Sequence, residues 1–149
     1  NWNPEEAQDL DAWISWRCSV ITNFVRRIRS ASRAGGKELS AAVFHYYPGG
    51  LLDIGQDWEQ WIREELVDYL FPMNYSRSTA IAAKWTRNNL ATHAAAGGRC
   101  HLWEGILRPV SMSAERFRLH VNGVLATGVE GIVIFEYPYL TDDDLKLLA

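Results

Sequence analysis

The sequence predicts an α/β fold in which helices alternate with the strands of a parallel sheet. Short segments such as 70–73 and 132–135 are apolar at odd and even positions alike, which is typical of strands covered on both faces. Segments with the 3.6-residue spacing of amphipathic helices separate them. Polar or aromatic residues follow each strand-like segment. Alternation of this kind predicts right-handed crossovers between parallel strands.

Composition limits the classes of protein to consider. The chain has 149 residues, of which 48% are hydrophobic and 22% charged, so we expect one globular domain over residues 1–149. A net charge of -3 gives no support for a nucleic-acid partner. No apolar run approaches the roughly 20 residues of a membrane-spanning helix. The seven Trp and six Tyr fit either a core of large side chains or a platform for sugar rings.

Cysteine and histidine indicate neither a metal site nor a cofactor. Cys18 and Cys100 lie far apart, which favours buried thiols, although the spacing also permits a disulfide. The four histidines show no metal-ligand spacing. Cys18 falls inside a predicted helix and Cys100 at the start of a predicted strand. Neither position suits a nucleophile, and we expect no acyl transfer.

A long helix opens the chain. Asn3-Pro4-Glu5-Glu6 is a helix start with a capping residue and a proline at the first helical position, and the helical pattern continues to about Ser32. We expect its buried stripe to be Ile21, Phe24, Val25 and Ile28. The arginines on the other side predict a solvated basic face, and these are Arg26, Arg27, Arg29 and Arg33.

The first two strands end in candidate site residues. The segment 39–47 is strand-like and ends in His45-Tyr46-Tyr47, before Pro48-Gly49-Gly50 breaks it and a loop follows. A helix then places Trp58, Trp61 and Ile62 on one face. A very short turn leads to the strand 70–73, which ends in Asn74-Tyr75.

The second half of the chain repeats this alternation. Ser76 or Ser78 can cap a helix that runs to about Ala96, for which we expect Ile81, Trp85 and Leu90 to be buried. A strand at 100–107 and a helix opened by Ser111 or Ser113 come next. The strand 132–135 ends at Glu136, and acidic residues after Thr141 start a last helix.

Two architectures fit four αβ units. One is an open four-stranded parallel sheet, and the other is half of an eight-stranded (β/α) barrel, which typically takes about 250 residues. No glycine-rich phosphate-binding fingerprint follows any of the strands. This absence argues against a nucleotide-binding open sheet.

The segment 55–75 resembles the later half of the bacterial glycosyl-hydrolase-like family 10 barrels. The resemblance is most specific in Gly55-Gln56-Asp57-Trp58, Trp61, Leu66-Val67-Asp68-Tyr69 and Pro72-Met73-Asn74-Tyr75, and it covers about residues 13–140. Trp16-Arg17 and Phe24-Val25-Arg26-Arg27-Ile28 resemble the helix after the family's fourth strand. The resemblance implies an α/β fold of (β/α)8 TIM-barrel type, with four βα units, the C-terminal half-barrel, in this chain. Nothing here corresponds to the family's acidic motif after the fourth strand.

The same resemblance implies a function in glycan chemistry. It suggests part of a glycoside-hydrolase-like domain that binds and hydrolyses a polysaccharide or cell-wall glycan, secreted or in the bacterial envelope, with this piece inactive alone. The alternatives are a non-catalytic carbohydrate-binding module and a self-associating half-barrel that pairs through open sheet edges or with a missing N-terminal half.

Candidate site residues follow from their places near strand ends. Glycoside hydrolysis usually needs two carboxyl groups, and only Glu104 and Glu136 lie late in strands. They are the catalytic candidates, with a structural ion pair or hydrogen bond as the competing interpretation. The substrate-binding candidates are His45, Tyr46, Asn74, Tyr75, Gln56 and Asp57. Gln56 and Asp57 also suit a structural role, capping the helix at Trp58, and Asp68 at the opposite strand end is expected to be structural.

Overall fold

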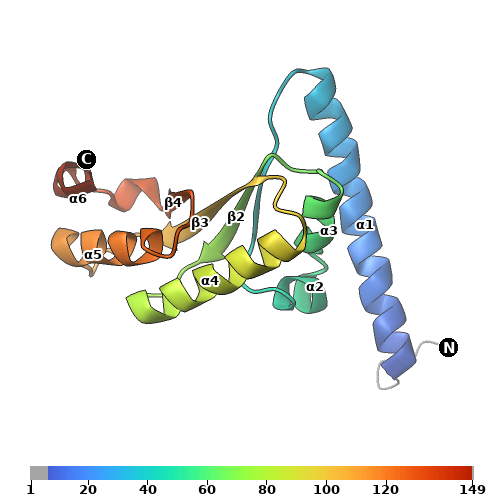
Figure 1. Ribbon diagram of the computed structural model, residues 1–149, viewed down its shortest axis with the longest axis horizontal. Coiled ribbons are helices and arrows are strands. Elements are labelled where there is room, and N and C mark those ends of the chain that lie inside the picture. Colours follow the sequence, from blue (N-terminus) through green and yellow to red (C-terminus); the bar gives the residue numbers. More distant parts are fainter. Residues whose placement is uncertain (1–6, 149) are drawn as a thin grey trace.

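The computed structural model describes residues 7–148 as a parallel sheet flanked by helices (Figure 1). The expected α/β fold is confirmed. The elements in chain order are α1 (Ala7–Ala34), β1 (Ser40–Phe44), α2 (Gly49–Ile54), α3 (Trp58–Arg63), β2 (Tyr69–Asn74), α4 (Thr79–Ala95), β3 (His101–Leu107), α5 (Ala114–Leu125), β4 (Gly131–Phe135), a 3-10 turn η1 (Tyr137–Tyr139) and α6 (Asp142–Leu148). The helix start predicted at Asn3 to Glu6 lies outside the described residues.

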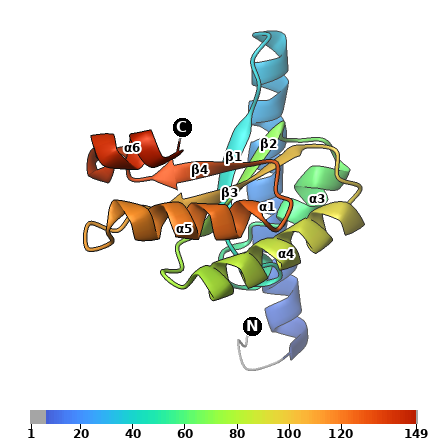
Figure 2. The same cartoon turned by 60° about the vertical axis from the view of Figure 1, so that its left-hand side comes forward.

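The four strands follow the order of the chain. The sheet order is β1-β2-β3-β4, and every neighbouring pair is parallel (Figure 2). Val43 pairs with Pro72, Met73 with Gly105, and Ile106 with Ile134. Right-handed crossovers that always advance in one direction place their helices on one face of a sheet. This sequential order is compatible with a half-barrel.

The hydrophobic core lies between the sheet and these helices. Val43, Leu70, Leu102 and Ile106 are almost fully buried, and each belongs to the parity of its strand that faces the helices. The helices contribute their own buried residues, which are Trp58, Trp61, Ile62, Phe117, Val121 and Val124. The predicted face of Trp58, Trp61 and Ile62 is therefore confirmed.

The opposite face of the sheet carries partly exposed aromatic side chains. Tyr69, Phe71 and Trp103 alternate with the buried positions. Their rings form a cluster, with 5.4 Å between the ring centres of Tyr69 and Trp103 and 6.1 Å between those of Tyr69 and Phe71. We call this surface the open face. It is apolar, and in a closed barrel it would be the interior.

Helix α1 buries a different stripe from the one expected. Ile21 and Val25 pack against the core, but Phe24 is 60% exposed and Ile28 37% exposed. Thr22 and Arg29 are buried instead, because each forms hydrogen bonds to a polar partner on another element. The Thr22 hydroxyl accepts a hydrogen bond from Trp61 Nε1 at 2.9 Å.

The basic cluster on α1 is not simply a solvated face. Both terminal nitrogens of Arg29 donate to the Asp68 carboxylate, and the backbone N–H of Leu39 donates to the same carboxylate. Arg26 makes a two-pronged ion pair with Glu64. The Arg29 hydrogen bonds hold the pKa of Asp68 below its usual range. These contacts fasten α1 to the turn before β2, and they confirm the structural role expected for Asp68.

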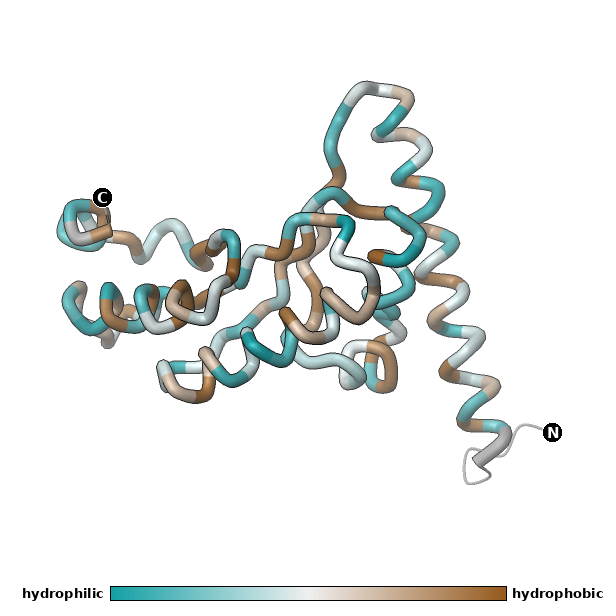
Figure 3. The backbone as a smooth tube through the Cα atoms, in the orientation of Figure 1, coloured by the Kyte–Doolittle hydropathy of each residue, from teal (hydrophilic) through white to brown (hydrophobic). Residues whose placement is uncertain are grey.

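Some helix details differ from the sequence pattern. The loop expected after Pro48 contains the short helix α2, which ends at Gly55 with a positive φ of 72°. In α4 the buried residues include Ala82, Thr86 and Asn89, whereas Ile81 is 46% exposed. Small and polar side chains fill this interface because β2 and β3 present polar groups to it. Hydrophobic residues recur along the tube in Figure 3, but within residues 7–148 no helix has the length and apolarity to cross a bilayer.

Candidate functional site

A cleft lies at the carboxyl ends of β1 and β2, where parallel α/β proteins place their ligands. It has a volume of about 370 Å³, and its wall is largely apolar and aromatic. The lining residues are Phe44, His45, Met73, Tyr75, Ser76 and Trp85. Two of the predicted substrate-binding residues, His45 and Tyr75, therefore line one cleft.

His45 is held in the cleft by Trp85. Their ring centres are 4.0 Å apart, and the centre of the Phe44 ring lies 5.4 Å from that of the imidazole. Burial lowers the pKa of His45, since a charged imidazole loses its hydration there. The ring is therefore neutral near pH 7 and offers one hydrogen-bond donor and one acceptor.

Tyr75 connects the cleft to the end of β4. Its ring centre lies 5.5 Å from that of Phe135, the residue before Glu136. Burial and the negative charge of Glu136 both raise the pKa of Tyr75, which keeps the phenol protonated as a hydrogen-bond donor. Glu136 itself is exposed. The structure thus brings His45, Tyr75 and Glu136 to one edge of the sheet.

Asn74 points away from this cleft, into the interface between the sheet and α4. It is fully buried, and its Nδ2 donates to the carbonyl oxygen of Ala82 at 3.0 Å and to Thr86 Oγ1 at 3.3 Å. The alternation of side chains along β2 explains this, because Tyr69, Phe71 and Met73 face the other way. Asn74 anchors the strand end that carries Tyr75.

Glu104 lies on the same helix-facing side as Asn74. It is fully buried, and its Oε1 accepts a hydrogen bond from Asn89 Nδ2 at 3.0 Å. Burial raises its pKa to about 7, against the opposing effect of Asn74 and Asn89. Glu104 and Glu136 therefore do not meet as a pair of carboxyl groups. A carboxyl group buried behind the sheet does not face a ligand in the cleft.

Gln56 and Asp57 hold the loops near the cleft. Gln56 Oε1 accepts a hydrogen bond from the backbone N–H of Phe44 at 2.8 Å. Because Phe44 is the last residue of β1, this bond holds the end of the strand in place. Asp57 caps α3 by accepting from the backbone N–H of Gln60 at 3.0 Å, and it also accepts from the Tyr47 hydroxyl at 3.1 Å. Burial, followed by the charge of Asp57, raises the pKa of Tyr47.

Tyr46 lies beside this region without lining the cleft. Its side chain is 48% exposed and packs over Gly49, where an added Cβ would approach the Tyr46 ring to 2.7 Å. A side chain at position 49 would therefore require the Tyr46 ring to shift. Tyr46 presents an exposed aromatic surface next to the His45 end of β1.

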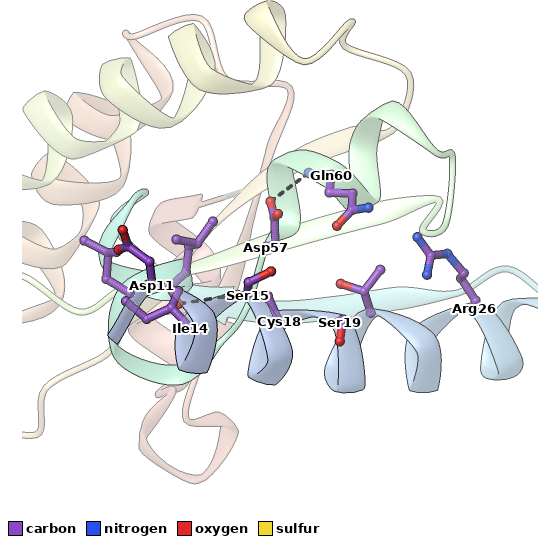
Figure 4. Close-up of a pocket in the computed structure, with 11 residues that line it drawn as sticks. Asp11, Ile14, Ser15, Cys18, Ser19, Arg26, Asp57 and Gln60 are labelled. Atoms are coloured by element: carbon purple, nitrogen blue, oxygen red, sulfur yellow. Dashed lines mark hydrogen bonds between the residues drawn. The ribbon is translucent and has the colours of Figure 1, made fainter. Parts of the chain in front are cut away.

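A larger cavity of about 530 Å³ lies between α1 and the segment from α2 to α3 (Figure 4). Figure 4 shows Asp57 and Gln60 facing Ser15, Cys18 and Ser19 of α1 across it. Cys18 and Cys100 are both buried free thiols, and burial raises the pKa of Cys18. Of the predicted site residues only Asp57 lines this cavity, on the helix side of the sheet.

The sequence pattern overlooked Trp85 as a site residue. Its helical spacing with Ile81 suggested a core position, but it lies two turns after the Ser78 cap of α4, next to the strand ends. This position early in α4 could have identified Trp85 as a site residue, because the start of α4 must lie next to the end of β2. Within the described ranges, no three His, Cys, Asp or Glu side chains gather as a metal site.

Comparisons with protein-family models and with curated protein sequences find no match to this chain.

Proposed function

We propose that this chain contributes the glycan-binding C-terminal half of a glycoside-hydrolase-like (β/α)8 barrel. The supporting observation is the cleft formed by His45, Tyr75 and Trp85 at the carboxyl ends of β1 and β2. Aromatic rings present flat apolar surfaces to the C–H faces of a sugar, and few polar groups fix its hydroxyls. The neutral imidazole of His45 and the protonated phenol of Tyr75 supply such groups.

Sheet topology also supports this proposal. Four sequential parallel strands are the number and order expected of half an eight-stranded barrel, and the apolar open face would be the inside of that barrel. The cleft then opens at the carboxyl-end mouth, where barrel enzymes bind substrates. A protein of this kind would act where glycans occur, in the bacterial envelope or outside the cell.

Glu136 is our candidate for the catalytic carboxyl group. It is exposed at the end of β4, and its charge reaches Tyr75. Glycoside hydrolysis usually requires a second carboxyl group about 5 to 9.5 Å away, and Glu104 is directed to the other side of the sheet. We therefore assign glycan binding, rather than cleavage, to this chain by itself.

Binding to a set of insoluble and soluble glycans, including peptidoglycan, tests the proposal. Tyr75→Ala should reduce the affinity about 5- to 30-fold, because a stacking ring in a binding site is worth roughly 1 to 2 kcal/mol. Tyr75→Phe keeps the ring and should lose less. Leu119→Ala, an exposed residue on α5, is the control. A folded chain that binds no glycan, or a Tyr75→Ala variant that binds as well as the wild type, contradicts the proposal.

A non-catalytic sugar-binding module is the second candidate, favoured by the burial of Glu104, the other catalytic candidate, on the helix side of the sheet. The variant Glu136→Gln, made in a protein that carries all eight βα units, distinguishes the enzyme from the binding module. Loss of hydrolysis with retained binding supports the enzyme. Binding without hydrolysis in the unaltered protein supports the module. Self-association through the open sheet edges remains a third proposal, motivated by β1 and β4 as outer strands.

A further inference from the structure

Hydrogen bonds of Asn74 join the end of β2 to the turn of α4 that carries Trp85. Asn74 Nδ2 donates to the carbonyl oxygen of Ala82 at 3.0 Å and to Thr86 Oγ1 at 3.3 Å. Ala82 lies three residues before Trp85, and Thr86 lies one residue after it. Because Tyr75 directly follows Asn74, these bonds set the spacing between two aromatic walls of the cleft, Tyr75 and Trp85.

These partners determine the orientation of the Asn74 amide. A carbonyl oxygen can only accept a hydrogen bond, so the amide nitrogen must face Ala82. Its two hydrogens are then used by Ala82 and Thr86. The other polar atom of the amide, Oδ1, is buried and has no donor among the described residues. Oδ1 is therefore the atom that Asn74 can offer to a further partner.

Glu104 reaches the Asn74 amide from the neighbouring strand β3. Both side chains are buried on the helix side, and the pairing of Asn74 with Ile106 makes Glu104 its diagonal neighbour. Glu104 Oε1 accepts a hydrogen bond from Asn89 Nδ2 at 3.0 Å, whereas the buried Oε2 has no donor within residues 7–148. Oε2 and Asn74 Oδ1 are both acceptors, so they can bond only when Glu104 carries a proton.

Removal of this proton leaves unsatisfied acceptors at the junction of β2 and α4. If the amide keeps its orientation, the carboxylate repels Asn74 Oδ1. If the amide turns to offer Nδ2 to the carboxylate, Oδ1 faces the carbonyl oxygen of Ala82, and the bonds to α4 are broken. Buried polar groups without partners are costly. Either arrangement therefore weakens the contact that holds the end of β2 against α4.

We propose that Glu104 is a positioning residue for the cleft, whose proton holds Asn74 against α4 and thereby sets the spacing of the aromatic walls. This role rests on the glycan binding proposed for the cleft, and it makes that binding dependent on pH. By linkage, a ligand that requires the ordered cleft also favours the protonated carboxyl group.

Other titratable groups around Glu104 leave the interval near neutral pH to it. Burial raises the pKa of Glu104 to about 7, and no charge of another described residue is among the causes. β1 and β4 contain no titratable side chain, and β2 contains Tyr69 on the open face. The remaining groups are exposed or half-buried, apart from a buried histidine that is bound to Thr79. They are Lys84, Arg87 and His93 on α4, Glu115, Arg116, Arg118 and the buried His120 on α5, and His101 at the start of β3.

NMR of the ligand-free chain tests the positioning role between pH 6 and 8. The side-chain amide of Asn74 and the indole N–H of Trp85 should shift together, with a midpoint near pH 7. Both shifts should disappear in Glu104→Gln, because its amide donates to Asn74 at every pH. The indole of Trp61, which donates to Thr22 on α1, should not shift in either chain. Signals of Asn74 and Trp85 that do not respond to pH, or that still move in Glu104→Gln, overturn the proposal.

Binding of soluble peptidoglycan fragments tests the coupling to the ligand. If only the protonated chain binds, the affinity of the wild type should fall about tenfold between pH 6 and 8. Glu104→Gln should bind equally well at both values, whereas Glu115→Gln, exposed on α5, should lose affinity as the wild type does. Both variants retain His45, so its titration cannot account for a difference between them.

The outcomes for Glu104 and for the glycan proposal are distinguishable. Binding of the fragments that is equally strong at pH 6 and 8 overturns the role of Glu104 and leaves the glycan proposal intact. Binding to no glycan at any pH contradicts the glycan proposal, and the NMR titration of Asn74 and Trp85 then decides the role of Glu104.

Discussion

At the scale of a single residue, the buried carboxyl group of Glu104 can complete the hydrogen bonds around it only when it is protonated. Its Oε2 and the Oδ1 of Asn74 are both buried acceptors without a donor among the described residues. A proton on Glu104 supplies the donor that this pair lacks. The raised pKa of about 7 agrees with this assignment, since burial disfavours the carboxylate. We interpret Glu104 as a neutral hydrogen-bonding group that orders the end of β2.

We predict that the free energy of unfolding decreases as the pH rises from 5 to 8. The folded pKa of Glu104, about 7, lies above its ordinary value of 4.5, so the folded chain binds more protons across this interval. The stabilisation is complete below about pH 4.5 and is lost as the pH rises to about 7. The total effect is on the order of 3 kcal/mol, measurable by urea unfolding at several pH values.

Glu104→Gln is the matched variant for this prediction. The amide has the shape of a protonated carboxyl group and can donate to Asn74, so it should remove this part of the pH dependence while keeping the stability at pH 5. Glu115→Gln, on the exposed side of α5, is the control. If the free energy of unfolding of Glu104→Gln depends on pH as strongly as that of the wild type, Glu104 does not titrate between pH 5 and 8.

At the level of elements, the helix α3 depends on one capping side chain. Asp57 accepts hydrogen bonds from the Gln60 backbone and from the Tyr47 hydroxyl, and it thereby joins α3 to the end of β1. Its position outside the carboxyl-end cleft distinguishes it from His45 and Tyr75. Its contribution should therefore be to stability rather than to ligand binding.

Asp57→Ala should lower the free energy of unfolding by about 1 to 2 kcal/mol, because the first turn of α3 loses its cap. Asp57→Asn, which can still accept a hydrogen bond from the backbone, should lose less of the free energy of unfolding. Urea unfolding measures both effects, and glycan affinity should be unchanged in the folded variants. A loss of affinity without a loss of stability would instead make Asp57 a ligand-binding residue.

Across the whole molecule, ion pairs of two buried arginines fasten the terminal helices to the sheet. Arg29 and Asp68 connect α1 to β2, and Arg108 Nε donates to Asp144 Oδ2 at 2.9 Å between the end of β3 and α6. Both Arg108 and Asp144 are buried. Although burial disfavours the charged carboxylate, hydrogen bonds from Arg108 and Thr141 hold the pKa of Asp144 below its ordinary value.

Asp144→Ala should lower the free energy of unfolding by roughly 3 to 5 kcal/mol, since it leaves the Arg108 guanidinium buried without its partner. The combined substitution Arg108→Met and Asp144→Leu should recover much of that loss, because no uncompensated charge remains. Thermal and urea unfolding of the three chains measure the difference. If the double variant is as unstable as Asp144→Ala, the loss comes from packing rather than from the charge.

The alternation of strands and helices could be predicted because apolar spacing depends on local sequence. All four strands were expected within a few residues of their positions, and Ser78 and Ser113 cap α4 and α5 as two of the suggested alternatives. The direction of individual side chains could not be predicted as well. Asn74 and Tyr75 are neighbours in sequence but lie on opposite sides of the sheet, because a strand reverses direction at every residue.

Contacts with residues far away in the sequence explain the remaining differences between the predicted and the observed burial on α1. Arg29 is buried because Asp68, 39 residues away, accepts its hydrogen bonds, and no local pattern on α1 indicates that contact. Phe24 is exposed although its spacing suits a buried stripe. Helical periodicity shows which residues share a face, whereas tertiary contacts decide which face is covered.

The sequential order of the strands has a consequence for how the chain folds. Each strand pairs with the strand that precedes or follows it, and the paired residues are about 30 positions apart throughout. Loop closure is therefore equally short at every step, and no pairing must await a distant part of the chain. We expect ordering to start at β2 and β3, whose pairing is central, and to spread outward one unit at a time, with the outer strands the first to exchange their amide protons.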